Sequence, residues 1–234
     1  MKKILIATDF SEASQNAGKY AASLAAAFNA RIILFHVYQP IFAAADISQY
    51  VVSADIKQMA LHDLAEEANV LNTEKRPGFY TFAEEGPIAK TICQKAAEHK
   101  VDLVVVGMKA KHKGLRKIFG STVTELLKKS AVPLMIIPEG THFRGINVLA
   151  VASGTDIPVH IDPHLLDVVA ALSEQFRAAT YVVGISKSRV EEAFHLLNRP
   201  YRLMKMVGHS DAMYEVVRNK DVTDGLTHFI ENFH

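Results

Sequence analysis

The sequence predicts an α/β protein built on a doubly wound, five-stranded parallel sheet, followed by an incomplete second copy of the same pattern. Short apolar runs that suit buried strands alternate with amphipathic helical patterns in both halves of the 234 residues. Strands that alternate with helices form parallel sheets with right-handed crossovers. We therefore expect a first domain at residues 1–139, a linker at 140–145 and a second domain at 146–234.

The first domain contains five predicted strands. Each is an apolar run of the kind that helices cover on both faces, and the runs are Lys3–Ala7, Arg31–Val37, Phe79–Phe82, Val101–Val106 and Pro133–Ile137. The third run is shorter and more polar than the others. That composition is typical of a sheet edge.

Helical patterns fill the gaps between these strands. The first begins after Ser11, which suits an N-cap, and ends at Asn29. The second, Asp55–Leu71, carries its apolar residues on one stripe, and we expect Asp63 and Glu67 to lie at the margin of that stripe and to face water. The remaining two patterns are Ile88–Ala96 and Ser121–Lys129.

The second domain repeats the first three strand–helix pairs. Its strands are predicted at Asn147–Ala152, Thr180–Ile185 and Tyr214–Val217, and its helices at 165–176, 189–198, 201–207 and 222–233. No fourth strand, phosphate loop or fifth strand follows. We expect a degenerate copy whose first strand is exposed at an edge.

Composition and charge narrow the function classes. The 26 basic and 25 acidic residues give a formal net charge of +1, so no global field favours nucleic acid or membranes. Cys93 is the single cysteine, which excludes an intramolecular disulfide and suits a reducing compartment. Asp9 interrupts the apolar run at the N-terminus, which argues against a signal peptide, and no run could span a membrane. We expect a soluble cytoplasmic protein.

The stretch from Gly107 to Thr122, GMKAKHKGLRKIFGST, predicts an anion site. It follows the most hydrophobic run of the chain and is rich in lysine and arginine. It ends in a Gly-Ser-Thr helix start, where Ser121 would serve as a cap and where backbone N–H groups bind phosphate well. A doubly wound sheet binds its ligand at the carboxyl ends of its strands, and Asp9, Val37 and Gly107 all lie at such ends.

Three features together resemble the universal stress protein family in its tandem-domain form. The first strand ends in Ala7-Thr8-Asp9, the second ends in His36-Val37, and the loop reads Gly107, Met108, Lys109, Ala110, nine residues, Gly120 and Ser121. The resemblance implies the strand order 3-2-1-4-5 of the adenine nucleotide alpha hydrolase-like fold. It also implies an aspartate beside adenine and ribose, a valine backbone at the adenine, and phosphates over the stretch that ends at Thr122.

The chain departs from the nucleotide-binding members of that family at Ala110, which stands where they have a second glycine. If that position needs a positive φ, alanine costs about 1 kcal/mol or more. The family includes nucleotide binders and members that bind none, so both kinds of protein stay open at this point.

From the resemblance we expect the first domain to bind ATP or another adenine nucleotide, with or without Mg²⁺, and to act as a stress-response binding and regulatory module. The alternative is a nucleotide-free interaction protein that works through dimerisation. A slow ATPase or an autophosphorylating enzyme is a third reading. The sequence contains no Walker lysine motif, no G-x-S-x-G elbow and no convincing acid–base pair, so no residue is predicted to be catalytic.

Assembly and the remaining polar residues can also be interpreted. An unpaired apolar edge strand invites pairing, and family members pair the edge that Leu134–Ile137 would form, so we expect a homodimer through it and leave further protein partners open.

His36 is interpreted as a near-core histidine and Cys93 as a packing residue. The spacing of His160, Asp162 and His164 suits a metal, but no fourth ligand follows, and a solvent-exposed loop is the better interpretation.

Overall fold

The computed structural model of the chain describes residues 1–39, 48–72, 78–109, 120–153, 162–188 and 212–232. These residues fall into two compact units, with the boundary between Arg144 and Gly145. Each unit has its own parallel sheet. Within these ranges, no helix is long and apolar enough to cross a membrane.

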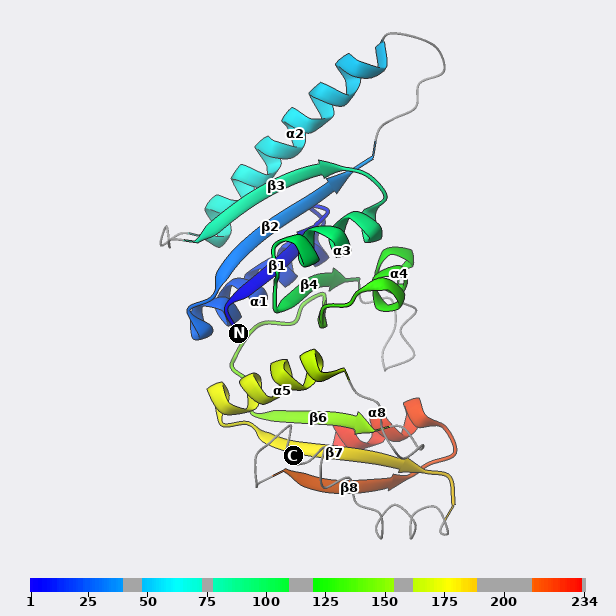
Figure 1. Ribbon diagram of the computed structural model, residues 1–234. Helices are drawn as coiled ribbons and strands as arrows, with labels where there is room; N and C mark the ends of the chain where they lie inside the picture. Colours follow the sequence, from blue (N-terminus) through cyan, green and yellow to red (C-terminus); the bar gives the residue numbers. More distant parts are fainter. Residues whose placement is uncertain (40–47, 73–77, 110–119, 154–161, 189–211, 233–234) are drawn as a thin grey trace. The chain divides into compact units, whose positions relative to one another are not determined.

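The first unit is built on a five-stranded sheet. Its strands are β1 (Lys3–Thr8), β2 (Arg31–Tyr38), β3 (Phe79–Glu85), β4 (Leu103–Met108) and β5 (Leu134–Pro138). They run parallel in the order β3-β2-β1-β4-β5, so β1 is central and β3 and β5 are edges (Figure 1). The predicted fold class and strand order 3-2-1-4-5 are confirmed.

Helices cover both faces of this sheet. They are α1 (Glu12–Phe28), α2 (Ser48–Leu71), α3 (Ile88–Glu98) and α4 (Ser121–Lys129). α1 contacts β1 and β4, α2 contacts β2 and β3, and α3 packs against α4. Figure 1 shows α3 in front of the sheet and α1 behind it. The inner strands β1, β2 and β4 are therefore buried on both faces, and Ile4, Leu5 and Ile6 of β1 are all 0% exposed.

The ends of α1 follow the sequence, whereas the start of α4 does not. Ser11 is the N-cap of α1 and accepts a hydrogen bond from the Ser14 backbone N–H at 3.3 Å, and Asn29 ends the helix in the left-handed conformation with φ 50°. Both predictions are confirmed. In α4 the N-cap is Gly120, and Ser121 is already helical. The prediction of Ser121 as the cap is wrong, because the N-cap side chain must precede the first helical residue.

The buried stripe of α2 includes a carboxyl group. Ala60, Leu64 and Glu67 are 5%, 0% and 7% exposed, respectively, while Ala68 is only partly buried. The prediction that Glu67 faces water is therefore wrong, and Asp63 remains partly exposed. Positions 60, 64 and 67 follow the i, i+4, i+7 spacing of a single helix face. Glu67 has a polar partner on this face, because the Thr8 hydroxyl of β1 lies 2.8 Å from its Oε2.

The second unit contains a three-stranded parallel sheet within the described ranges. Its strands are β6 (Val148–Ser153), β7 (Ala179–Ser186) and β8 (Met213–Arg218), in the order β6-β7-β8. The described helices are α5 (Pro163–Phe176) and α8 (Val222–Asn232). The strands match their predicted positions. The helices predicted at 189–198 and 201–207 lie outside the residues that the structure describes.

Each face of this second sheet carries its own small apolar cluster. Leu166 of α5 packs with Val182 on one of them, and Phe229 of α8 packs with Val183 and Ile185 on the other. Because neighbouring residues of a strand point to opposite faces, Val182 and Val183 separate the two clusters. The second unit therefore has helices on both faces of its sheet.

Candidate functional site

The register of the first sheet brings the ends of β1, β2 and β4 to one edge. Ala7 pairs with Phe35 on β2 and with Val106 on β4, and Thr8 pairs with His36. The residues that follow these pairs along β1, β2 and β4 are the Asp9 turn, Val37 and Gly107, respectively. The strand order of the sheet reverses direction at β1, and doubly wound sheets bind their ligands at such a point.

Asp9 lies in a tight turn between β1 and α1. Its Oδ1 accepts hydrogen bonds from the Ser11 backbone N–H at 3.1 Å and from the Ser11 hydroxyl at 2.5 Å. The side chain is exposed, and Ser14 also contributes to the hydrogen bonding of the carboxyl group. Oδ1 thus supports the start of α1, while the exposed carboxyl group lies at the end of β1.

Beneath this turn lies a buried polar cluster, which we define as Thr8, Ser14 and Glu67. Their exposed fractions are 6%, 4% and 7%. The Thr8 hydroxyl lies 2.8 Å from Glu67 Oε2 and 3.1 Å from Ser14 Oγ, and it accepts a hydrogen bond from the Phe10 backbone N–H at 3.0 Å. The cluster joins the end of β1 to α1 and α2.

The two carboxyl groups beside the turn have pKa values that are shifted in opposite directions. Burial raises the pKa of Asp9, but hydrogen bonds from Ser11 and Ser14 outweigh burial, and the net pKa lies below its ordinary value. Burial raises the pKa of Glu67; the hydrogen bond with Thr8 lowers it by less, and the negative charge of Asp9 adds a still smaller increase. Environments that separate two such pKa values favour one ionised and one neutral carboxyl group.

An aromatic pair closes the side of the turn that faces β2. His36 Nδ1 donates a hydrogen bond to the Thr8 carbonyl oxygen at 2.8 Å, because that oxygen can only accept. The His36 ring lies against the ring of Phe10, with centroids 4.4 Å apart and planes inclined by 31°. Phe10 has a φ of 63°, a conformation that is uncommon for an aromatic residue. The near-core interpretation of His36 is confirmed, since its ring is partly buried and Nδ1 is paired.

Gly107 is required by packing. A Cβ atom built on Gly107 would lie 2.5 Å from the carbonyl carbon of Ala13 and 2.7 Å from the backbone nitrogen of Ser14. Both atoms belong to the first turn of α1, whose backbone therefore passes directly over the end of β4. The neighbours differ in exposure, because Met108 is buried and Lys109 is exposed.

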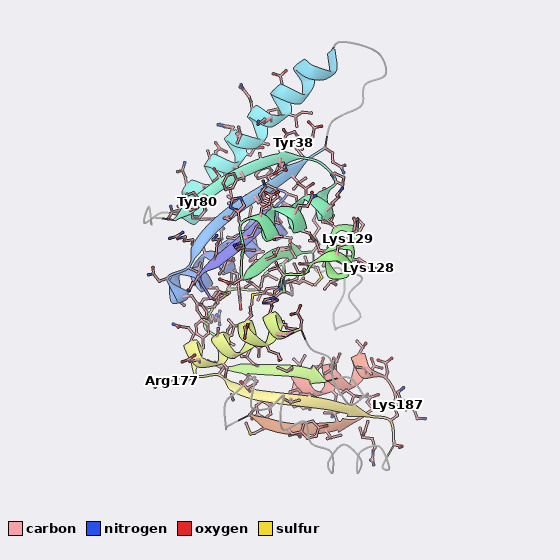
Figure 2. All side chains as sticks on the ribbon, viewed as in Figure 1. Tyr38, Tyr80, Lys128, Lys129, Arg177 and Lys187 are labelled. Atoms are coloured by element: carbon pink, nitrogen blue, oxygen red, sulfur yellow. The ribbon has the colours of Figure 1, made fainter. Side chains whose placement is uncertain are left out.

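Among the described residues, the start of α4 has few neighbours. Gly120 has a φ of −59°, no described heavy atom lies within 4 Å of a Cβ built on it, and no described side chain caps the helix. Ser121 is exposed and Thr122 partly so. Lys128 and Lys129 lie in the last turn of α4, at the opposite end from Gly120 (Figure 2). Within the described ranges, the first-turn N–H groups therefore have no capping side chain.

Some predicted site residues lie outside the described ranges, and others have local roles. Ala110 and the rest of the lysine-rich loop at 110–119 belong to the first group. Asp162 is the N-cap of α5 and accepts a hydrogen bond from the His164 backbone N–H at 2.9 Å. Cys93 packs against the apolar core beneath α3 and α4, and burial raises the pKa of its thiol.

Sequence reasoning missed the contribution of Ser14 and Glu67 to this site. For Ser14, the available signal was its position three residues after the N-cap Ser11, where it faces back toward the turn. For Glu67, the signal was an acidic residue in register with Ala60 and Leu64 on the apolar stripe. A charge at such a position indicates a polar partner across the interface.

Comparison with known proteins places the chain in a family. The family model described as Universal stress protein family matches residues 1–138. The chain belongs to the universal stress protein family. A universal stress protein of Methanocaldococcus jannaschii is 27% identical over 139 residues, which are 58% of this chain and 81% of that protein.

A solved structure of the family shares the fold. A universal stress protein from Archaeoglobus fulgidus matches with a TM-score of 0.70 at 15% identity, over 98% of this chain and 83% of that chain. A family protein from Arabidopsis thaliana with AMP bound is 22% identical, over 60% of this chain and 94% of that one, with a TM-score of 0.42. The Archaeoglobus match extends the likeness in fold across both units.

Proposed function

We propose that the first unit binds ATP or a related adenine nucleotide at the edge formed by the ends of β1, β2 and β4. The observation that carries this proposal is the register that gathers the Asp9 turn, Val37 and Gly107 at the reversal point of the sheet. Membership of the universal stress protein family supports a role for the bound state in stress responses.

The polar groups at this edge suit the two ends of a nucleotide. Asp9 is ionised at neutral pH because its pKa is lowered, and its exposed carboxylate can accept hydrogen bonds from ribose hydroxyls. At the other end, the first-turn N–H groups and the dipole of α4 favour a phosphate beside Gly120, Ser121 and Thr122. Lys109 is exposed and adds positive charge where β4 ends.

Isothermal titration calorimetry tests this proposal, with ATP, AMP and Mg²⁺–ATP as titrants. Asp9→Asn should weaken binding about tenfold, because a charge-assisted hydrogen bond is lost. Glu12→Gln is the matched control, since it removes an exposed charge in the first turn of α1. Absence of both heat and a thermal shift at millimolar ATP would contradict the proposal.

Gly120→Val tests the phosphate end separately. No described heavy atom lies within 4 Å of a Cβ built on Gly120 and its φ is negative, so valine should leave the unfolding temperature nearly unchanged. A loss of ATP affinity in that variant would then report obstruction of the ligand. If slow ATP hydrolysis is found in the wild type and persists in Gly120→Val, the start of α4 takes no part in it.

Two observations favour a second function, that of an interaction protein which works through dimerisation. β5 is an edge strand with an apolar sequence, LMIIP, and Gly107 has a packing role that needs no ligand. We propose a homodimer that pairs β5 with its counterpart, while the second unit is a degenerate copy of a tandem arrangement without a nucleotide site. Sedimentation velocity at micromolar concentration tests the dimer, and a monomer would contradict it.

A further inference from the structure

The carboxyl group of Glu67 lies in a place where an ionised form has few favourable contacts. Its Oε1 is buried and receives no hydrogen bond within the described part of the chain. α1 covers this oxygen closely, since a Cβ built on Gly18 would lie 3.3 Å from Oε1. A buried carboxylate without partners is costly, whereas the carbonyl oxygen of a neutral acid tolerates one missing hydrogen bond much better.

The hydrogen-bond chain through the buried polar cluster can be checked by counting protons. The chain has three oxygen–oxygen contacts: Glu67 Oε2 to Thr8 Oγ1 at 2.8 Å, Thr8 Oγ1 to Ser14 Oγ at 3.1 Å, and Ser14 Oγ to the Ser11 carbonyl oxygen at 2.9 Å. Each contact needs one proton. The two hydroxyls supply two protons between them.

Within the described residues, no other hydroxyl supplies the third proton. The Ser11 hydroxyl lies 3.4 Å from Ser14 Oγ, but its proton is engaged with Asp9 Oδ1 at the shorter distance of 2.5 Å. The Phe10 N–H fills a lone pair of Thr8 Oγ1 and does not lie between any of the three oxygen pairs. If Glu67 were ionised, one of the three contacts would bring lone pairs together without a proton. A protonated Glu67 Oε2 completes the chain in one direction, from Glu67 to Thr8, from Thr8 to Ser14 and from Ser14 to the Ser11 carbonyl.

We propose that Glu67 is a positioning residue of the nucleotide site, a neutral carboxylic acid whose proton orients Thr8 and thereby fixes the turn that presents Asp9. This inference rests on the proposed function for the identity of the ligand. The Thr8 hydroxyl, once oriented by Glu67, accepts from the Phe10 N–H and so holds the residue that follows Asp9. When Glu67 loses its proton, the Thr8 hydroxyl turns to donate to the carboxylate, and the Thr8–Ser14 contact is left without a proton, which weakens the hold of α1 on the turn.

The groups that face Glu67 are consistent with this role. β1 and its turn contribute Thr8 and the negative charge of Asp9, and α1 contributes Ser14 and Gly18, which has no side chain. β2 reaches the same turn through His36, which is bonded to the Thr8 carbonyl. Asp9 is the charged group that acts on Glu67, and it acts in the direction that retains the proton on Glu67.

The first arm of the test uses the free protein. The side-chain carboxyl carbon of Glu67 and the backbone amide of Phe10 are followed by NMR between pH 4 and pH 9 in the wild type and in Glu67→Gln. We expect both signals to titrate together, above the range of ordinary glutamates, in the wild type. In Glu67→Gln the Phe10 backbone amide should lack this titration, because the side-chain amide introduced at position 67 donates to Thr8 at every pH. Titration of Glu67 in the ordinary range, or a Phe10 amide that does not follow it, would overturn the proposal.

The second arm measures ATP affinity by calorimetry over the same pH range. Protonation of ATP affects both affinities equally, so its effect cancels in the ratio of the wild-type affinity to that of Glu67→Gln. Wild-type affinity should fall about fivefold to tenfold relative to Glu67→Gln as Glu67 loses its proton, and Glu67→Leu should be weaker at every pH. Glu66→Gln is the control, because Glu66 lies on the same helix with its side chain 71% exposed. Equal pH profiles for wild type and Glu67→Gln would overturn the positioning role.

The two arms separate this inference from the proposed function. If the wild type binds no ATP while the Glu67 and Phe10 signals titrate together, the proposed ligand is wrong and the action of Glu67 on the turn stands. If ATP binds and Glu67 titrates as an ordinary acid, the proposed function stands and Glu67 has no positioning role.

Discussion

β1 and β6 open the two units in the same way, but their surroundings differ. β1 lies between β2 and β4, and its central residues are completely buried. β6 has β7 on one side and forms the edge of the described sheet, and Val148 at its start is 43% exposed. A site at the end of β1 draws residues from strands on both sides. At the end of β6, the described sheet offers a neighbouring strand on one side.

The paired strand ends also differ in chemistry. Counted from the start of each ladder, the sixth pair is Thr8 with His36 in the first unit and Ser153 with Gly184 in the second. A Cβ built on Gly184 would lie 2.7 Å from the Tyr214 hydroxyl, so a tyrosine from β8 occupies the space that a side chain would need. The contact that His36 makes with the turn after β1 has no equivalent at Gly184.

The largest expected difference between the units concerns the first strand. Ile4 and Leu149 are both the second residue of their ladders, and Ile4 is 0% exposed while Leu149 is partly exposed. Ile4→Ala should lower the free energy of unfolding by about 4 kcal/mol, and Leu149→Ala by about 1 kcal/mol, because cavity costs scale with burial. Urea unfolding followed by circular dichroism measures both. Equal losses would show that β6 is covered in solution.

The next expected effect concerns Gly107. Gly107→Ala should destabilise the first unit by about 3 kcal/mol, because the new methyl group meets the backbone of α1, which cannot rotate away. Gly184→Ala should cost less, since the obstacle is the end of the Tyr214 side chain. Both variants can be measured by denaturant unfolding. A Gly107→Ala variant as stable as the wild type would contradict the expected difference between Gly107 and Gly184.

A smaller effect is expected from pH. The folded pKa of Glu67 lies above its ordinary value of 4.5, so between that value and the folded pKa the native state binds more protons than the unfolded state. Stability should therefore fall as pH rises through this interval, by up to about 1.4 kcal/mol per pH unit. Thermal unfolding of the wild type, compared with that of Glu67→Gln, isolates the contribution of Glu67 to the pH dependence of stability. A difference that is constant across pH would contradict the raised pKa.

Asp9 acts with the opposite sign. Its folded pKa lies below the ordinary value of 3.8, so its contribution is complete above that value and is lost as pH falls through the folded pKa. Asp9→Asn should flatten this acid limb in the same thermal measurements. The two carboxyl groups thus limit the stability of the first unit from opposite sides of the pH scale.

The smallest expected effects are at the helix caps. Ser11→Ala and Asp162→Ala each remove an N-cap and should each cost about 1 kcal/mol in their own units. Ser11→Ala should also raise the pKa of Asp9, because the Ser11 hydroxyl and Asp9 are hydrogen-bonded. NMR titration of the Asp9 side chain checks this second consequence. An unchanged Asp9 pKa would show that the backbone N–H of Ser11 is the dominant donor.

The first sheet could be predicted from sequence because its information is local. Alternating apolar runs and helical patterns indicate strands, helices and parallel pairing without knowledge of distant contacts. Glu67 could not be placed in this way, because positions 67 and 68 lie about equally close to the stripe and a charge normally favours water. Its partners, Thr8 and Ser14, are brought to it by the fold. The prediction of Ser121 as the cap was wrong because backbone conformation defines the N-cap, and Gly120 has the N-cap conformation. Residue type alone does not reveal that conformation.

The close passage of α1 over the end of β4 changes how relatives of this protein should be read. A glycine at position 107 is demanded by the crossing of two backbones, so homologues will retain it whether or not they hold a nucleotide. Among the described residues, Gly120 has no neighbour within 4 Å of a Cβ built on it, and its φ is one that any residue can adopt. In an alignment, a glycine at position 107 therefore marks the architecture. A change at position 120, by contrast, should accompany the loss of ligand binding among relatives.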